Sequence, residues 1–182
     1  AKKKNWEEYQ KMLATSIKII TLICVPITFY SLLTGKEIIS LVFKSNAFDD
    51  NSVAMTLNVF IFHIAGLVFI ALNRIISPAF YAQGNTKLPT LAGIISLGFN
   101  ILFAFILSFK FKGPGIAFAL SFSSLINTIF LFIFMKKLNT INTKSLIVSS
   151  VLYLIKIIFL SAIASIPIIF LYPSIVESFL NY

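Results

Sequence analysis

Residues that could perform acid–base chemistry are few in this sequence. Its 182 residues include six acidic side chains, one histidine and one cysteine. Hydrolysis or group transfer would need paired carboxylates, a metal cluster, or a nucleophile beside its base. We therefore predict no catalytic residue, no metal site and no cofactor, and we do not expect an enzyme. The acids lie outside the long apolar blocks of the chain: Glu7, Glu8, Glu37, Asp49, Asp50 and Glu177.

The histidine and the cysteine do not alter this expectation. His63 has no acid within one helical turn. We interpret it as a neutral side chain bonded to a neighbouring helix, with a proton relay as the alternative. Cys24 stands in an apolar run without companion ligands, which is typical of a small buried residue.

Cations inside the apolar blocks are more informative. Arg74 and Lys156 stand where a charge is costly and usually faces a cavity, an acid or a polar ligand. Water, a helix outside this sequence or an anionic substrate could balance them. Snorkelling toward lipid headgroups stays an open alternative for both, and is the simplest interpretation of Lys18. Asn100, in another block, could line a polar cavity or form an interhelical hydrogen bond.

The elements that carry these residues are predicted to be membrane-spanning helices. The chain is 58% hydrophobic and 12% charged, whereas soluble domains are about 25% charged. About 20 apolar residues span a bilayer as a helix, and shorter alternating strands would indicate a barrel. We therefore predict an all-α integral membrane bundle of about five transmembrane helices. The spans are expected at about residues 15–34, 53–82, 88–108, 115–135 and 145–172.

The net charge of +9 is better explained by membrane orientation than by nucleic-acid binding. With the N-terminus inside, eight loop lysines are cytoplasmic and four are external, as the positive-inside rule favours. Residues 37–44 are too short to span and are expected to lie at the interface. The odd span count and the start without methionine indicate part of a larger bundle. The lysines expected in the cytoplasm are Lys2, Lys3, Lys4, Lys11, Lys87, Lys136, Lys137 and Lys144. The lysines expected outside are Lys36, Lys44, Lys110 and Lys112.

Three ordered segments carry a family resemblance. Residues 74–89, RIISPAFYAQGNTKLP, resemble the R/K-x5-FYA-x2-D-x-K/R-x-P stretch of the MurJ/MviN lipid II flippases. Residues 41–48, LVFKSNAF, are similar to the LLF-x2-GAF segment of that family. Residues 113–121, GPGIAFALS, are similar to its G-x2-GLALATS helix start, with one residue fewer between the glycines. Asn100 stands where the family has an asparagine. The sequence departs from the family at Asn85, where aspartate is usual, and at Asn46, where glycine is usual.

The resemblance implies a fourteen-helix transporter of the multidrug/oligosaccharidyl-lipid/polysaccharide exporter superfamily. Two six-helix lobes would surround a cationic cavity. Residues 1–138 would be helices nine to twelve of the second lobe, and residues 139–182 would form an extra C-terminal helix. Such a protein moves an undecaprenyl-pyrophosphate-linked peptidoglycan precursor across the bacterial cytoplasmic (inner) membrane by alternating access, for cell-wall synthesis. Its expected partners are that precursor, membrane lipids and the missing helices of the same transporter.

Five residues are candidates for contact with substrate or for lining the cavity. We expect Arg74 to attract the pyrophosphate, and Lys87 with Asn85 to shape the cytoplasmic gate. Asn100 and Lys156 complete the set. Three other functions stay open: another exporter of the superfamily for O-antigen lipid or drugs, a membrane enzyme acting on polyprenyl lipids, and a non-catalytic scaffold. The enzyme would require intramembrane or interfacial acids that the sequence does not supply.

Overall fold

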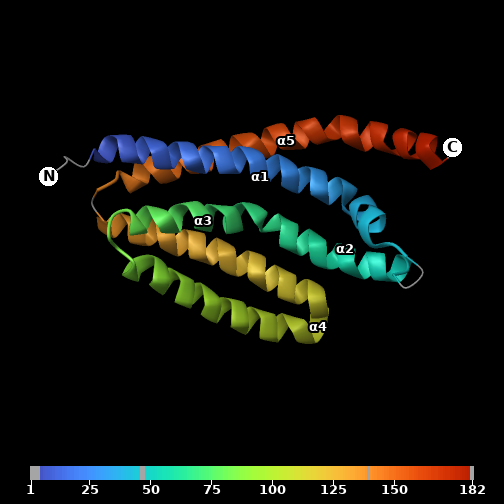
Figure 1. Ribbon diagram of the computed structural model, residues 1–182, viewed down its shortest axis with the longest axis horizontal. Coiled ribbons are helices and arrows are strands. Elements are labelled where there is room, and N and C mark those ends of the chain that lie inside the picture. Colours follow the sequence, from blue (N-terminus) through green and yellow to red (C-terminus); the bar gives the residue numbers. More distant parts are fainter. Residues whose placement is uncertain (1–4, 46–47, 139, 181–182) are drawn as a thin grey trace.

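The computed structural model describes the backbone of residues 5–45, 48–138 and 140–180, and side chains as far as Phe170. Asn46 and the lysines at positions 2–4, used above, lie outside the described residues. Figure 1 shows an elongated bundle in which the first and last helices run side by side in the same direction. The elements are α1 (Trp6–Phe43), α2 (Asp50–Ala65), α3 (Leu67–Tyr81), α4 (Lys87–Met135), the 3-10 helix η1 (Lys136–Leu138) and α5 (Thr143–Leu180).

The helices supply five segments that can cross a membrane, as predicted. By length and composition, α1, α4 with η1, and α5 each qualify, and α2 with α3 forms a bent fourth candidate. However, α4 reverses direction at Lys112, where φ is 50° and ψ is −127° (Figure 1). Ser96 of the first arm donates a hydrogen bond to the Ser123 carbonyl of the second at 2.6 Å. The two arms are therefore antiparallel neighbours and count as separate crossings.

The tight turn of α4 replaces a loop that we expected between residues 109 and 114. Within α4, only Lys112 has non-helical φ and ψ angles, so the chain reverses direction without a separate loop. A Cβ added to Gly115 would lie 2.5 Å from the Leu107 carbonyl oxygen. Glycine at this position therefore allows the two arms to converge immediately beside the turn.

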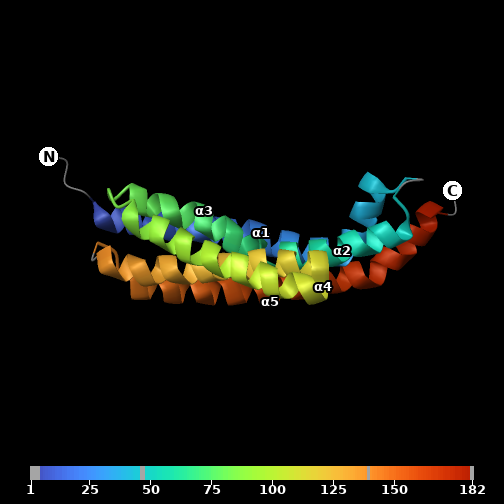
Figure 2. The ribbon, with the colours of Figure 1, turned by 90° about the horizontal axis from the view of Figure 1, so that it is seen from below.

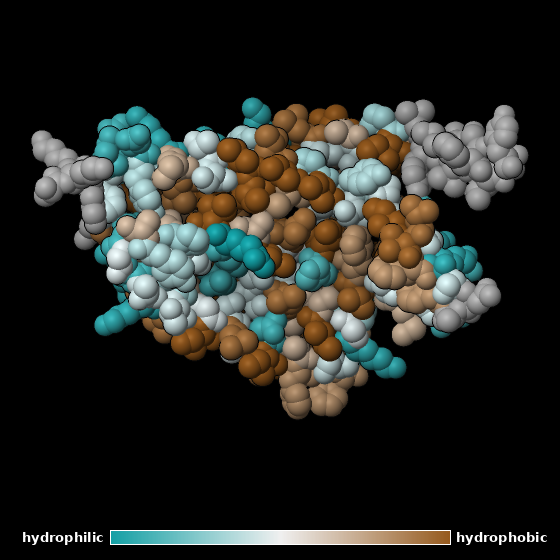
Figure 3. All heavy atoms as spheres, viewed as in Figure 1, coloured by the Kyte–Doolittle hydropathy of each residue, from teal (hydrophilic) through white to brown (hydrophobic). Residues whose placement is uncertain are grey.

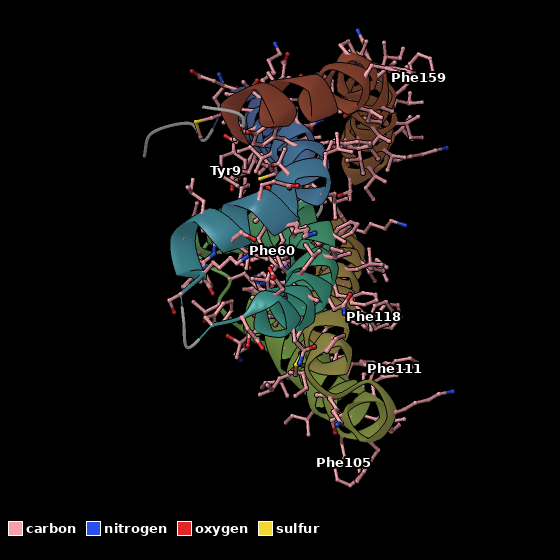
Figure 4. The ribbon with its side chains drawn as sticks, turned by 90° about the vertical axis from the view of Figure 1, so that its right-hand side faces the viewer. Tyr9, Phe60, Phe105, Phe111, Phe118 and Phe159 are labelled. Carbon is pink, nitrogen blue, oxygen red and sulfur yellow. The ribbon has the colours of Figure 1, made fainter. Side chains whose placement is uncertain are left out.

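The first helix continues beyond Gly35, where the sequence suggested that its span would end. Gly35 is buried, and an added Cβ would lie 3.1 Å from Leu57 and from Phe60, which Figure 4 shows between α1 and α2. The residue thus serves close helix packing. Beyond it, the end of α1 turns away from the bundle axis (Figure 2), with Leu41 89% exposed and Val42 64% exposed. This exposed apolar end has the character expected of an interfacial segment.

Asp49 fixes the beginning of α2. Its carboxylate accepts hydrogen bonds from the Ser52 backbone N–H at 2.9 Å and the Ser52 hydroxyl at 2.8 Å. These bonds stabilise the charged form and hold the pKa of the Asp49 carboxyl below its usual range. A negative cap also interacts favourably with the positive end of the helix dipole.

A break at Gly66 bends α2 relative to α3 by 41°. The Gly66 N–H donates to the His63 carbonyl at 3.1 Å, so the Phe62 carbonyl gives up its usual helical partner. Ser121 of α4 donates its hydroxyl to that Phe62 carbonyl at 2.6 Å. An unsatisfied carbonyl is costly in a membrane, so this hydroxyl stabilises the bend.

The core lies between α1, α3, the second arm of α4 and α5. Its fully buried members include Ile17, Ile76, Phe80, Leu131 and Met135. The outside is also apolar: brown residues cover much of the middle of the molecule in Figure 3. Phe105, Phe111, Phe118 and Phe159 project away from the helices in Figure 4. Such a surface is suited to lipid, and the molecule is a multi-pass membrane protein.

Candidate functional site

Arg74 lies on the face of α3 that is turned away from the bundle. The buried positions of this helix, which include Leu72 and Ile76, follow the helical repeat on one side. Arg74 lies two residues, or about 200°, from Leu72. It is exposed and forms no ion pair or hydrogen bond with the described residues. Its positive charge is therefore available to a group outside these helices.

Asn85 and Lys87 lie where α3 passes into α4. Gly84 has φ 75°, and the Asn85 N–H donates to the Phe80 carbonyl at 3.0 Å, which closes the end of α3. The Asn85 side chain accepts a hydrogen bond from the Leu88 N–H at 3.1 Å and so caps α4. Lys87, in the first turn of α4, is exposed. Asn85 thus positions the turn, whereas Lys87 is free to contact a ligand.

Asn100 is engaged inside the α4 hairpin. Its Nδ2 donates to the Ser123 hydroxyl at 3.2 Å, and the side chain is half-buried. This is the interhelical hydrogen bond that we gave as the alternative to a cavity role. Asn127, on the second arm of α4, has a buried Oδ1 without a hydrogen-bond partner among the described residues.

A second polar link joins α3 to α4 and was not predicted. Asn73 donates to the Ser124 carbonyl at 3.0 Å, and the Thr128 hydroxyl donates to the Asn73 Oδ1 at 2.9 Å. Asn73 immediately precedes Arg74, so this link fixes the rotation of α3 and with it the direction of the arginine. The sequence signal that could have predicted this link is Asn73 itself, a polar residue inside an apolar block and directly beside the cation Arg74.

Lys156 lies elsewhere, on an exposed face of α5. It lines a groove between α5 and α1 together with Lys18, whose ammonium lies 5.9 Å from the centre of the Tyr153 ring. The sequence-predicted residues therefore do not form one cluster. Asn85 and Lys87 share a turn, whereas Arg74, Asn100 and Lys156 occupy three separate environments.

Hydrogen bonds between distant segments hold together the end of the bundle that carries Lys87. The Tyr9 hydroxyl donates to the Ala79 carbonyl at 2.6 Å, and the Asn142 N–H donates to the Gln10 side chain at 2.8 Å. Thr140 donates its hydroxyl to Gln83. This network ties the start of α1 to the α3–α4 turn and to the segment before α5. Sequence reasoning missed it because its residues are far apart in the chain.

The family model described as Lipid II flippase MurJ matches residues 1–181. The chain belongs to this family. The probable lipid II flippase MurJ of Treponema pallidum (strain Nichols) is 42% identical over 165 residues, which cover 91% of this chain and 31% of that protein. The one from Buchnera aphidicola subsp. Acyrthosiphon pisum (strain APS) is 32% identical over 124 residues, or 68% of this chain and 24% of that protein.

A solved structure supports the same fold. Lipid II flippase MurJ in its inward closed conformation superposes with a TM-score of 0.70 at 21% sequence identity. The match covers 98% of this chain and 41% of the solved one. The chain therefore spans less than half the length of the MurJ proteins it matches, and its helices match part of their longer fold.

Proposed function

We propose that the protein moves an undecaprenyl-pyrophosphate-linked peptidoglycan precursor, lipid II, across the bacterial cytoplasmic membrane by alternating access. The observation that carries this proposal is the match to the lipid II flippase MurJ family along residues 1–181. The described helices would supply one side of the transport pathway, and helices outside this sequence would supply the rest. In this proposal the chain binds and moves lipid II and does not alter it chemically.

Arg74 is the proposed contact for the pyrophosphate. It is exposed, it lacks an acidic partner among the described residues, and the Asn73–Thr128 link holds its helix in a fixed rotation. An unpaired guanidinium at membrane depth is expensive unless a polar ligand or water solvates it. It also matches phosphate geometry through two parallel hydrogen bonds. These properties favour a cavity-lining position.

The α3–α4 turn is the proposed cytoplasmic gate element. Asn85 would fix its shape through the bond to Leu88, and exposed Lys87 would present a positive charge at the mouth of the pathway. Asn100 is proposed to support the pathway only by holding the α4 arms together. Residues 1–138 would belong to the second transporter lobe, and residues 139–182 would form an extra helix. The proposed orientation places the start of α1 in the cytoplasm.

Complementation tests the function. The natural protein, with all of its residues, would be expressed in bacteria depleted of their own lipid II flippase, and precursor exposure on the outer face would be assayed. We expect restored exposure, and its loss by at least tenfold in an Arg74→Glu variant because the reversed charge repels pyrophosphate.

Arg74→Lys is the matched variant, and we expect it to retain part of the activity because it keeps the charge without the bidentate geometry. Membrane insertion of each variant would be checked by its abundance in the membrane fraction. Precursor trapped inside despite correct insertion of the natural protein would contradict the flippase assignment and favour another exporter of the superfamily. Full transport by Arg74→Glu would instead remove only the role of this arginine.

A further inference from the structure

A groove between α1 and α5 gathers basic and hydroxyl side chains. Its volume is about 480 Å³, and its polar lining consists of Lys18, Ser145, Ser149, Tyr153 and Lys156. Ammonium and hydroxyl groups together can donate several hydrogen bonds to one phosphate. The groove is separate from the exposed face of Arg74 and from the α3–α4 turn, so the proposed transport pathway does not account for it.

The charges of this groove are not balanced by the described residues. The two ion pairs among those residues are Lys11–Glu7 and Lys44–Asp50, and neither includes a lysine of the groove. Glu8 lies ten residues before Lys18, or about 15 Å along the helix. Tyr153 contacts Lys18 through its ring and offers it no negative charge. An anion from outside the chain is the complementary occupant.

The two lysines lie at a similar depth. Helices α1 and α5 run in the same direction (Figure 1) and begin at Trp6 and Thr143. Lys18 and Lys156 lie twelve and thirteen residues beyond these starts, which corresponds to about 18 and 20 Å. Helical side chains lean toward the N-terminus, so both ammonium groups are directed back toward the same membrane surface. That direction suits a lipid headgroup.

An exposed apolar stripe begins inside the groove, where Val148 and Leu152 form part of the lining, and continues beyond it along α5. Its members are spaced at helical intervals: Val148 is 50% exposed, Leu152 62%, Ile155 57% and Phe159 65%. Figure 4 shows Phe159 projecting away from the bundle. The stripe covers twelve residues and rises about 16 Å from Val148 to Phe159, which is comparable with an acyl chain in one leaflet. A basic groove followed by an apolar stripe matches an amphipathic lipid.

We propose that this groove binds an anionic phospholipid of the surrounding bilayer. Its phosphate would lie between Lys18 and Lys156, with an acyl chain along the stripe from Val148 to Phe159. A zwitterionic lipid is disfavoured because its own cation would approach the two lysines. The site does not rest on the proposed transport function, because it is defined by bound lipid and not by movement of a substrate.

Native mass spectrometry of the purified natural protein, titrated with phosphatidylglycerol or phosphatidylcholine of identical acyl chains, tests the site. We expect preferential retention of phosphatidylglycerol. Lys18→Gln and Lys156→Gln should each weaken its binding about fivefold, as expected for one lysine beside an anionic headgroup. Phosphatidylcholine binding should not change. Lys156→Met, which suits the apolar surroundings, provides a second neutral variant if the glutamine variant does not fold.

The matched control is Lys110→Gln, because Lys110 is also exposed and also lies beside an aromatic ring, 5.6 Å from the centre of Phe111. It should bind phosphatidylglycerol normally, as should Lys18→Arg. Equal retention of the two phospholipids by the natural protein, or unchanged binding in both neutral variants, would overturn the site. Undecaprenyl pyrophosphate would be titrated in the same way. If the neutral variants lost binding of this lipid alone, that result would also overturn the proposed site, because it would assign the groove to a transport substrate.

Discussion

Individual polar side chains in this protein act mainly on the backbone of a neighbouring helix. Asn73 and Ser96 donate to carbonyls of the second α4 arm, and Ser121 donates to the Phe62 carbonyl. Interhelical bonds between side chains in membranes contribute about 0.6 kcal/mol on average. Their larger effect here is to set the rotation and bend of helices, and thereby the direction of nearby functional groups such as Arg74.

Asn85 provides a test at this scale. Asn85→Ala should lower the free energy of unfolding by about 1 kcal/mol because the Leu88 N–H loses its cap. Asn85→Asp should keep the cap and gain from the positive end of α4. Chemical unfolding in detergent and hydrogen exchange at residues 86–90 would measure both. Asn58→Ala is the control, because Asn58 is exposed and forms no hydrogen bond with the described residues. An equal effect at Asn58 would contradict the capping role.

The helices themselves depend on glycines at close contacts. A Cβ at Gly66 would lie 2.3 Å from the Ser121 hydroxyl and 2.7 Å from the Ser121 Cα. Gly66→Ala should therefore destabilise the protein by about 1–3 kcal/mol through overpacking. Thermal unfolding in detergent would measure the loss. Because the clash includes the Ser121 backbone, adding Ser121→Ala should not restore stability.

Gly93 supplies the matched control for that substitution. It is helical, and an added Cβ would meet no atom within 4 Å. Gly93→Ala should leave stability unchanged or raise it by up to about 1 kcal/mol through helix propensity. A similar loss at both glycines would show that general helix effects, and not the contact with Ser121, determine the result.

At the reversal of α4, in contrast to Gly66, we predict a substitution that stabilises the protein. Lys112 adopts φ 50° and ψ −127°, a conformation that side chains other than glycine rarely occupy. Lys112→Gly should raise the free energy of unfolding by about 1 kcal/mol by relieving that strain. Lys110→Gly, at a helical position, should lower it by about 1 kcal/mol. Unfolding of both variants in urea would compare them, and destabilisation by Lys112→Gly would contradict the strain.

Apolar length predicted the crossings well but not how the chain bends. The block at residues 53–82 was longer than one span requires, and that excess was the available signal for the break at Gly66. The reversal between residues 109 and 114 was predicted, but as a loop. Its restriction to one non-helical residue, Lys112, could not be foreseen because it depends on a single backbone conformation. Cation positions predicted Arg74 and Lys156 as unusual residues. Their separation could not be foreseen, since it depends on which helix faces pack together.

At the scale of the whole molecule, the two ends differ in charge and in their proposed side of the membrane. Cys24, together with any cysteine outside this sequence, would first be replaced by alanine to give a background without cysteine. In the natural protein, Lys110→Cys in this background should react with an impermeant maleimide in intact cells. Lys137→Cys should react only after permeabilisation, because it belongs to the predicted cytoplasmic set. Reversed labelling would contradict the proposed orientation but not the fold.

The α4 turn also has a consequence for biosynthesis. Only 11% of the residues in the most apolar stretch of α4 are buried within the described bundle. The two arms form hydrogen bonds with each other through Ser96, Asn100 and Ser123. We expect the arms to enter the membrane together as one hairpin. In the proposed orientation, the leading tip carries Lys110 and Lys112 across the hydrocarbon, where each lysine costs about 3 kcal/mol at the centre. The residues that mark the outer face would thus also make the hairpin slow to insert, and slow to come back out.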